Sequence, residues 1–181
     1  MTLTYSIVGV VGAGAMGRGI AQIAAQAGST VRLYDAHAAA VVKARDEVFS
    51  QWDRMREKGR LDAGAVQACK QRLQPAGSMQ DLADCELVVE AIVERLDAKK
   101  ELFAQLEAIV KPTAVLVTNT SSLSVTAIAA GLKYPERLAG YHFFNPVPLM
   151  KVVEVIAGLK TDSAVCEGLA VYATEMGHKP V

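Results

Sequence analysis

Apolar and polar positions follow two different rhythms along this chain. Short runs of apolar, largely β-branched residues, such as Ser6–Val11, end at glycine or polar residues and predict buried strands of a parallel sheet. Longer stretches with apolar residues three and four positions apart predict helices. The first of these, residues 15–27, stops at Gly28, a residue type that commonly ends helices.

The order of these segments predicts the architecture. Strands are predicted at 6–11, 30–34, 86–92, 114–118, 138–144 and 151–156, and helices at 15–27, 36–56, 62–73, 97–110 and 162–177. Alternation of strand and helix is typical of a parallel sheet with helices on both faces. The double-proline turn Asn145–Pro148 joins the last two strands directly. We therefore predict an α/β fold with a doubly wound, mostly parallel sheet and an antiparallel strand at its end.

Composition excludes several classes of function. The chain has 181 residues, 51% hydrophobic and 21% charged, which is ordinary for a globular domain. Its 19 Lys and Arg balance 19 Asp and Glu, so net charge gives no attraction for nucleic acid or an anionic membrane. No apolar run reaches the roughly 18 residues of a membrane span. We expect no nucleic-acid partner and no membrane partner.

The cysteines indicate a reducing compartment. Cys69, Cys85 and Cys166 are odd in number and show no CxxC spacing, which favours free thiols over a disulfide framework or a zinc site. The apolar start also lacks the basic segment of a signal peptide. We expect a cytoplasmic protein without a bound metal.

A glycine-rich turn follows the first predicted strand and opens the first predicted helix. Its GxGxxG residues are Gly12, Ala13, Gly14, Ala15, Met16 and Gly17. Gly12 would make the tight turn, Gly14 would admit a pyrophosphate, and Gly17 would let the helix pack on the strand. The helix N-terminus would then bind the phosphates. In this strand–turn–helix context the motif predicts a Rossmann-type dinucleotide site.

An acidic residue completes this motif. Asp35 ends the second predicted strand, 18 residues after Gly17. A carboxylate there can accept hydrogen bonds from both adenosine-ribose hydroxyls and would repel a 2′-phosphate, which favours NAD over NADP. The alternative is a glycine-rich turn that merely packs well, with Asp35 as the N-cap of the next helix.

Two further segments carry chemistry in the second half of the chain. The segment Thr118–Ser124, which contains the run TNTSSL at residues 118–123, follows a predicted strand at the sheet edge where ligands bind in such folds and leads into a helix. For this run alone, simple helix capping is an equal alternative. The run HFFNPVPLMKVVEV, residues 142–155, spans the double-proline turn.

These runs, together with VVEAIVE at residues 88–94 and the glycine turn, resemble the N-terminal nucleotide-binding domain of the L-3-hydroxyacyl-CoA dehydrogenase family. The pattern is most similar to bacterial members that act on 3-hydroxybutyryl-CoA and 3-hydroxyadipyl-CoA. The resemblance implies NAD-dependent oxidation of the 3-hydroxyl of a 3-hydroxyacyl-CoA to the 3-oxoacyl-CoA, as in fatty acid β-oxidation.

The resemblance also implies a domain organisation. Residues 1–181 correspond to the NAD-binding Rossmann domain, and family members carry a second, helical domain that forms a homodimer and closes over substrate. Lys179-Pro180-Val181 resembles the start of an element that the chain does not complete, so we expect a larger protein.

A His–Glu pair is catalytic in this family, and the matching residues are His142 and Glu154. Oxidising a secondary alcohol requires a base for the hydroxyl proton, and histidine titrates in the useful range. A carboxylate would fix its tautomer and stabilise the imidazolium. A hairpin centred on Pro148, six residues from each, would place the two side chains opposite one another. The alternative is a histidine satisfied by any acceptor beside an unrelated edge glutamate.

The resemblance assigns substrate contacts to two more residues. Ser121 should hydrogen-bond the substrate's C3 oxygen beside the cofactor, and Asn145 should hold the substrate and the nicotinamide region. Ser122 is expected to be structural. Another family asparagine that contacts substrate belongs to the second domain.

Three charged residues complete the predicted site. Glu94 and Lys99 match family positions near the cofactor, and the alternative for each is a solvated charge at a helix start. Lys58 matches a position that reaches the phosphorylated end of CoA, and the alternative is an ordinary surface lysine.

Two competing functions remain at this stage. One is a non-catalytic, NAD-binding redox sensor, which would have no use for His142 and Glu154 as a base and its partner. The other is a related dehydrogenase of free hydroxy acids, against which the TNTSSL and HFFNP runs argue.

Overall fold

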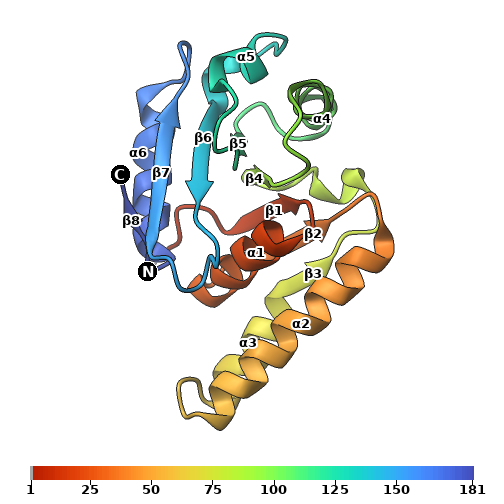
Figure 1. The fold of residues 1–181 in the computed structure, drawn as a ribbon, viewed down its shortest axis with the longest axis vertical. Coiled ribbons are helices and arrows are strands. Elements are labelled where there is room, and N and C mark those ends of the chain that lie inside the picture. Colours follow the sequence, from red (N-terminus) through yellow and green to blue (C-terminus); the bar gives the residue numbers. More distant parts are fainter. Residues whose placement is uncertain (1) are drawn as a thin grey trace.

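A computed structural model describes residues 2–181, and its centre is one eight-stranded sheet with the order β3-β2-β1-β4-β5-β6-β7-β8 (Figure 1). The strands are β1 Ile7–Val11, β2 Thr30–Tyr34, β3 Leu73–Pro75, β4 Leu87–Glu90, β5 Val115–Thr118, β6 Leu138–Phe143, β7 Val152–Ala157 and β8 Lys179–Pro180. Only β6 and β7 pair antiparallel, and all other neighbours pair parallel. The predicted doubly wound, mostly parallel sheet is confirmed.

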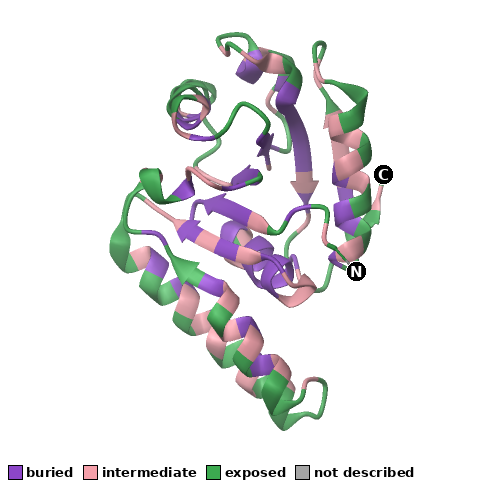
Figure 2. Cartoon of the chain, turned by 180° about the vertical axis from the view of Figure 1, so that it is seen from behind, coloured by how far each residue is buried: buried purple, intermediate pink, exposed green. Residues whose placement is uncertain are grey.

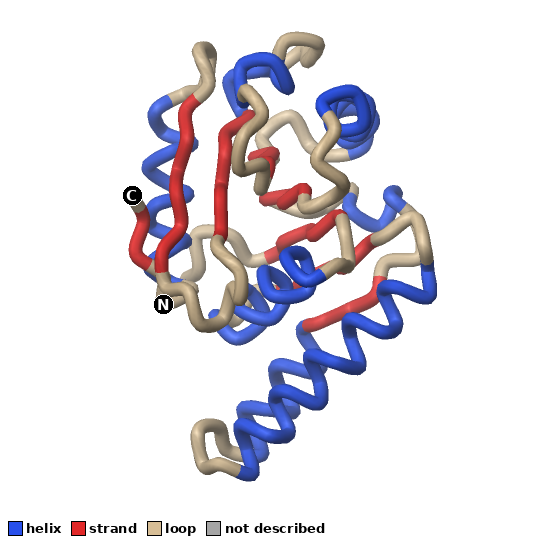
Figure 3. The backbone as a smooth tube through the Cα atoms, viewed as in Figure 1, coloured by secondary structure: helices blue, strands red, loops and turns tan. Residues whose placement is uncertain are grey.

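Five of the six α-helices lie close to their predicted ranges, and the short helix that follows the TNTSSL run had no predicted range (Figure 3). They are α1 Ala15–Ala27, α2 Ala38–Glu57, α3 Ala63–Arg72, α4 Leu96–Ile109, α5 Val125–Ala129 and α6 Ser163–Glu175, with 3-10 turns η1 Met79–Leu82 and η2 Pro135–Arg137. Local chemistry sets their ends. Gly28, with φ 116°, adopts the left-handed conformation that terminates α1. The Asp62 carboxylate accepts from the Ala65 amide at 2.7 Å and caps α3.

Both faces of the sheet are covered by helices, and the buried residues form two layers (Figure 2). Val8 and Val10 of β1 point into the layer beneath α1, α2, α3 and α6. Val11 and Val88 point into the opposite layer, beneath α4, α5 and η1. This alternation follows from the two-residue repeat of strands that are buried on both sides.

The helices α2 and α3 form an antiparallel pair that extends beyond the sheet (Figure 1). Trp52 of α2 is fully buried and donates from Nε1 to the Gln26 side chain at 3.0 Å. Gly59, with φ 72°, makes the turn between the two helices. The far end of the pair is mostly exposed (Figure 2).

One short strand departs from the sequence-based expectations, and a second begins where a further element was expected. Leu73, predicted as the end of a helix, begins β3 because its buried side chain pairs opposite Val31 of β2. Lys179 and Pro180, expected to start an uncompleted element, form β8, which runs parallel to β7. Within residues 2–181 no helix is long and apolar enough to cross a membrane.

Candidate active site

The glycine turn lies at the carboxyl end of β1, and its three glycines differ in what surrounds them. Gly12 has φ 108°, and a Cβ there would lie 2.3 Å from the Ala91 carbonyl oxygen. A Cβ on Gly17 would lie 1.7 Å from the Gly12 carbonyl oxygen. A Cβ on Gly14 would meet nothing within 4 Å. Gly12 therefore makes the tight turn, Gly17 lets the helix pack closely, and Gly14 leaves open space, each as predicted from the sequence.

The N-terminus of α1 suits an anion. Among the described residues no side chain caps this end, and its first turn holds no acidic residue. The amides of the first turn therefore face outward beside Gly14, and the helix dipole places partial positive charge there. The site fits a pyrophosphate without any cationic side chain.

Asp35 is tied to this turn. One carboxylate oxygen accepts from the Ala13 amide at 2.9 Å and the other from the His37 amide at 2.8 Å. Helix α2 begins at Ala38 and its N-cap is His37, so the alternative assignment of Asp35 as that cap is wrong. The two backbone bonds fix the carboxylate next to the glycine turn, where a ribose would follow a bound pyrophosphate.

His142 and Glu154 are direct neighbours across β6 and β7. They pair in the antiparallel register, as the hairpin centred on Pro148 predicted. Nδ1 of His142 lies 3.7 Å from Oε2 of Glu154, within ion-pair range and slightly beyond hydrogen-bond range. The His142 side chain is 16% exposed and that of Glu154 42% exposed, so the pair lies at the surface of the site. The ring centroids of Phe144 and His142 lie 4.6 Å apart, with the two rings tilted by 56°.

The TNTSSL turn lies beside this pair. The Asn119 side-chain oxygen accepts from the Phe143 amide at 2.9 Å, which joins the turn to the residue that follows His142. Ser121 and Ser122 are both exposed at the turn. The Ser124 hydroxyl accepts from the Ala127 amide at 3.1 Å and caps α5. The alternative of helix capping is therefore correct for Ser124, whereas Ser121 stays exposed.

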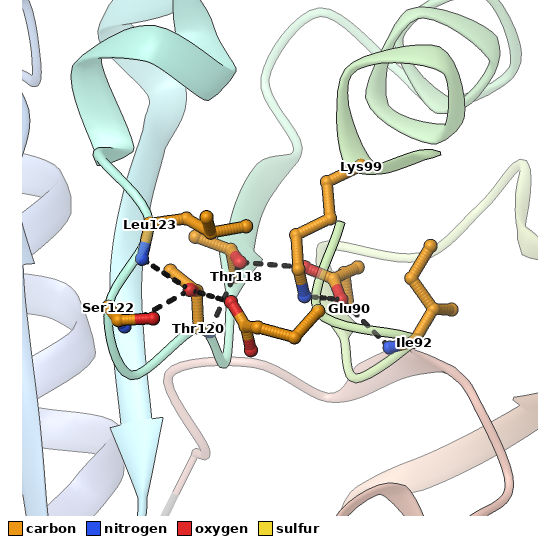
Figure 4. A network of polar contacts seen from close by, with 8 residues as sticks. Glu90, Ile92, Lys99, Thr118, Thr120, Ser122 and Leu123 are labelled. Carbon is orange, nitrogen blue, oxygen red and sulfur yellow. Dashed lines mark hydrogen bonds and ion pairs between the residues drawn. The ribbon is translucent and has the colours of Figure 1, made fainter. Parts of the chain in front are cut away.

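Glu94 and Lys99 are placed very differently. Glu94 is exposed and accepts a hydrogen bond from the Thr120 hydroxyl at the TNTSSL turn. Lys99 is 1% exposed and its ammonium lies 2.5 Å from Glu90 (Figure 4). The alternative of a solvated charge is therefore wrong for Lys99. Its burial also leaves no surface for direct contact with a cofactor in this conformation.

A groove of about 1230 Å³ runs between α1, α2 and the residue 145–151 loop. Asn145 is one of the residues that line this groove. Its lining includes five cations and two carboxylates: Arg18, Lys43, Arg54, Arg60, Lys151, Asp46 and Glu47. Lys58 is exposed at the C-cap of α2 and does not line the groove.

Sequence reasoning missed several residues of this region. Arg54 and Arg60 line the groove, and Lys58, which lies between them in the sequence, does not. Gly19 lets the hairpin loop pack on α1, since a Cβ there would lie 2.8 Å from Val147. Glu90 is fully buried at the end of β4. A carboxylate that ends an otherwise apolar strand was the available signal for Glu90.

The sequence matches the model of the 3-hydroxyacyl-CoA dehydrogenase NAD binding domain over residues 7–181. The chain belongs to this family. The predicted resemblance is thereby confirmed, and so is NAD as the cofactor of the domain. Which of the predicted residues contact NAD stays a prediction.

Curated and structural relatives agree with the family. The 3-hydroxyadipyl-CoA dehydrogenase of Escherichia coli K12 is 45% identical over 181 residues, covering 100% of this chain and 38% of that protein. The 3-hydroxybutyryl-CoA dehydrogenase of Bradyrhizobium diazoefficiens is 41% identical over 177 residues, covering 98% of this chain and 60% of that protein. A crystal structure of 3-hydroxybutyryl-CoA dehydrogenase from Escherichia coli K12 has a TM-score of 0.96 at 46% identity, covering 98% of this chain and 38% of that one.

Proposed function

We propose that the full-length protein oxidises the 3-hydroxyl of a 3-hydroxyacyl-CoA with NAD. The proposal rests on the pairing of His142 with Glu154, which lies at the same end of the parallel strands as the glycine turn. A protein that only sensed NAD would have no use for a base there. The relatives' names supply the substrate class, and this chain spans 38% and 60% of the two curated relatives' lengths.

The proton step is assigned to the cross-strand pair. Bound NAD supplies the acceptor for the hydride that leaves C3. His142 accepts the hydroxyl proton on Nε2, because Nδ1 faces Glu154 at 3.7 Å. The Glu154 carboxylate stabilises the imidazolium that results. A shift of a few tenths of an ångström would bring the pair to hydrogen-bond distance, which is common when substrate closes a site.

The remaining predicted contacts divide between substrate and cofactor. Ser121, exposed at its turn, would donate to the C3 oxygen, and Asn145 would hold the acyl thioester from the hairpin loop. The first-turn amides of α1 and the Asp35 carboxylate would bind the pyrophosphate and the adenosine ribose. Glu94 would line the cofactor side, whereas Lys99 would act from the interior.

The cationic groove suits the phosphorylated end of CoA. Arg54 and Arg60 of this groove are exposed, and neither is paired with a carboxylate among the described residues. Guanidinium groups bind phosphate oxygens in bidentate fashion. We assign this contact to them in addition to Lys58. Arg54→Gln should raise the KM for a CoA ester about ten-fold, while Lys160→Gln, on an exposed turn outside the groove, should leave it unchanged.

Steady-state turnover of the full-length protein tests the proposed reaction. The panel holds 3-hydroxyacyl-CoA esters of increasing chain length, one ester with a terminal carboxylate, and the matching free 3-hydroxy acids. We expect NADH formation with the esters and none with the free acids. Equal rates on free acids would replace the proposal with a hydroxy-acid dehydrogenase, and NAD binding without any turnover would replace it with a sensor.

Assembly and location are further proposals. We propose a second, helical domain that follows this one and joins two copies into a homodimer. Light scattering on the full-length protein would show a monomer if that were wrong. We also propose a cytoplasmic location, in keeping with the free thiols of Cys69, Cys85 and Cys166.

A further inference from the structure

A buried ion pair lies beneath the TNTSSL turn (Figure 4). Glu90 is 0% exposed and Lys99 is 1% exposed, and their oxygen and nitrogen atoms lie 2.5 Å apart. The same carboxylate oxygen accepts from the Ile92 amide at 2.8 Å. Desolvation makes a buried pair a poor source of net stability, so its presence calls for a role beyond stability.

The pair is joined to the turn by a chain of hydrogen bonds (Figure 4). The Thr118 hydroxyl donates to the second Glu90 oxygen at 2.6 Å and accepts from the Thr120 amide at 3.2 Å. The Thr120 hydroxyl accepts from the Leu123 amide at 2.9 Å and donates to Glu94. The residues on both sides of Ser121 are therefore held by one network.

Asn119 gives the turn a second attachment. Its amide donates to the Glu90 carbonyl oxygen at 2.9 Å, and its side chain accepts from the Phe143 amide at 2.9 Å. The turn is thus fixed both to the end of β4 and to the strand residue that follows His142. Ser121 itself makes none of these side-chain bonds and projects from a turn that its neighbours hold.

We propose that Thr118, held by the buried Glu90–Lys99 pair, is a positioning residue that sets the turn of residues 119–122 and so places Ser121 relative to His142. A hydroxyl bonded to a carboxylate in a buried site is held more strongly than one bonded to a neutral group. A displacement of the turn by about 1 Å would cost about 100-fold in rate in an aligned site. The claim about turnover rests on the proposed function, whereas the claim about the order of the turn does not.

Two substitutions at one position separate positioning from packing. Thr118→Val keeps the shape of the buried side chain and removes its hydroxyl, whereas Thr118→Ser keeps the hydroxyl. In the full-length protein we expect Thr118→Val to lower kcat about ten-fold with the KM for NAD within about two-fold. Thr118→Ser should keep kcat within about three-fold of the parent.

A matched control removes a buried hydrogen bond elsewhere. The hydroxyl of Tyr172, a residue of α6, lies 2.8 Å from the Ser29 hydroxyl, and both residues are buried. Tyr172→Phe should lower the melting temperature and leave kcat unchanged. If Thr118→Val also lowered only the melting temperature, or if Thr118→Ser failed to restore kcat, Thr118 would have a packing role and the proposal would be overturned.

Amide hydrogen exchange of residues 119–124 tests the turn independently of catalysis. Thr118→Val should speed exchange at Thr120 and Leu123, and Thr118→Ser should not. Absence of turnover in the parent protein would contradict the proposed function. The hydrogen-exchange rates would then still show whether the Thr118 hydroxyl holds the turn in place. Unchanged exchange in Thr118→Val would overturn the positioning role in either case.

Discussion

Two glycine-to-alanine substitutions, three residues apart in the same turn, should have opposite effects. Gly14 has φ −73° and open space where a Cβ would stand. Gly17 has its position for a Cβ only 1.7 Å from the Gly12 carbonyl oxygen. Gly14→Ala should therefore leave the fold intact and obstruct the cofactor, whereas Gly17→Ala should disturb the fold itself.

The magnitudes follow from this geometry. At Gly17 the carbonyl oxygen would have to move from 1.7 Å to at least 3.0 Å, and backbone cannot yield as a side chain can. We expect a loss of at least about 3 kcal/mol of unfolding free energy, the upper end for overpacking. At Gly14 an alanine fits without strain, so this substitution should raise the free energy of unfolding by about 0.4 to 1 kcal/mol. A methyl group where the pyrophosphate approaches should raise the Kd for NAD at least about ten-fold.

Urea unfolding followed by circular dichroism gives the first quantity, and titration calorimetry with NAD gives the second. Both use the full-length protein, and each variant serves as the other's control. If Gly14→Ala bound NAD as tightly as the parent, the pyrophosphate would not approach at Gly14. If Gly14→Ala lowered the free energy of unfolding as much as Gly17→Ala does, the inference that a Cβ fits at Gly14 would be wrong.

Three more predictions test the cofactor preference, the catalytic pair and the response to alkali. Asp35→Ala should reduce the preference for NAD over NADP, because the carboxylate that would repel the 2′-phosphate is removed. Titration calorimetry with each cofactor gives the two Kd values. An unchanged ratio of these Kd values would show that Asp35 does not determine cofactor selectivity. His142→Ala should lower kcat by about 10² to 10⁴ and Glu154→Gln by less, with no further loss in the double variant and an unchanged Kd for NAD; additive losses would mean separate roles. Burial, reinforced by the Glu175 carboxylate, raises the pKa of Tyr5 to about 12 from 10.0. Neutral Tyr5 should contribute its full share of the free energy of unfolding below about pH 10, and this contribution should be lost as the pH rises toward 12. The urea concentration at the unfolding midpoint should therefore fall between these pH values, and it should fall less in Tyr5→Phe.

Elements with strong local punctuation could be predicted from sequence. Helix α1 starts after a glycine turn and stops at Gly28, and its predicted range is the observed one. The hairpin register was also predictable, because a turn centred on Pro148 leaves one pairing of His142 with Glu154. In each case residues near in sequence determine the structure.

The misses depend on contacts between distant segments. Strand β3 has only three residues and is defined by its pairing with β2, which no local pattern reveals. Lys99 is a residue type that is almost always exposed, and its burial follows from the position of Glu90 on β4. The groove forms only where α1, α2 and the hairpin loop pack together, so Arg54 and Arg60 carried no sequence signal.

The first strand of the chain occupies the interior of the sheet, and this sets an order on folding during synthesis. β1 lies between β2 and β4, so one partner is made at once and the other only after residue 87. The glycine turn completes its shape against Ala91, which directly follows β4 and is synthesised long after the turn itself. A nascent domain can begin to collapse before then, but its long-range pairings come late. We therefore expect NAD to bind the nascent chain only after β4 has paired with β1.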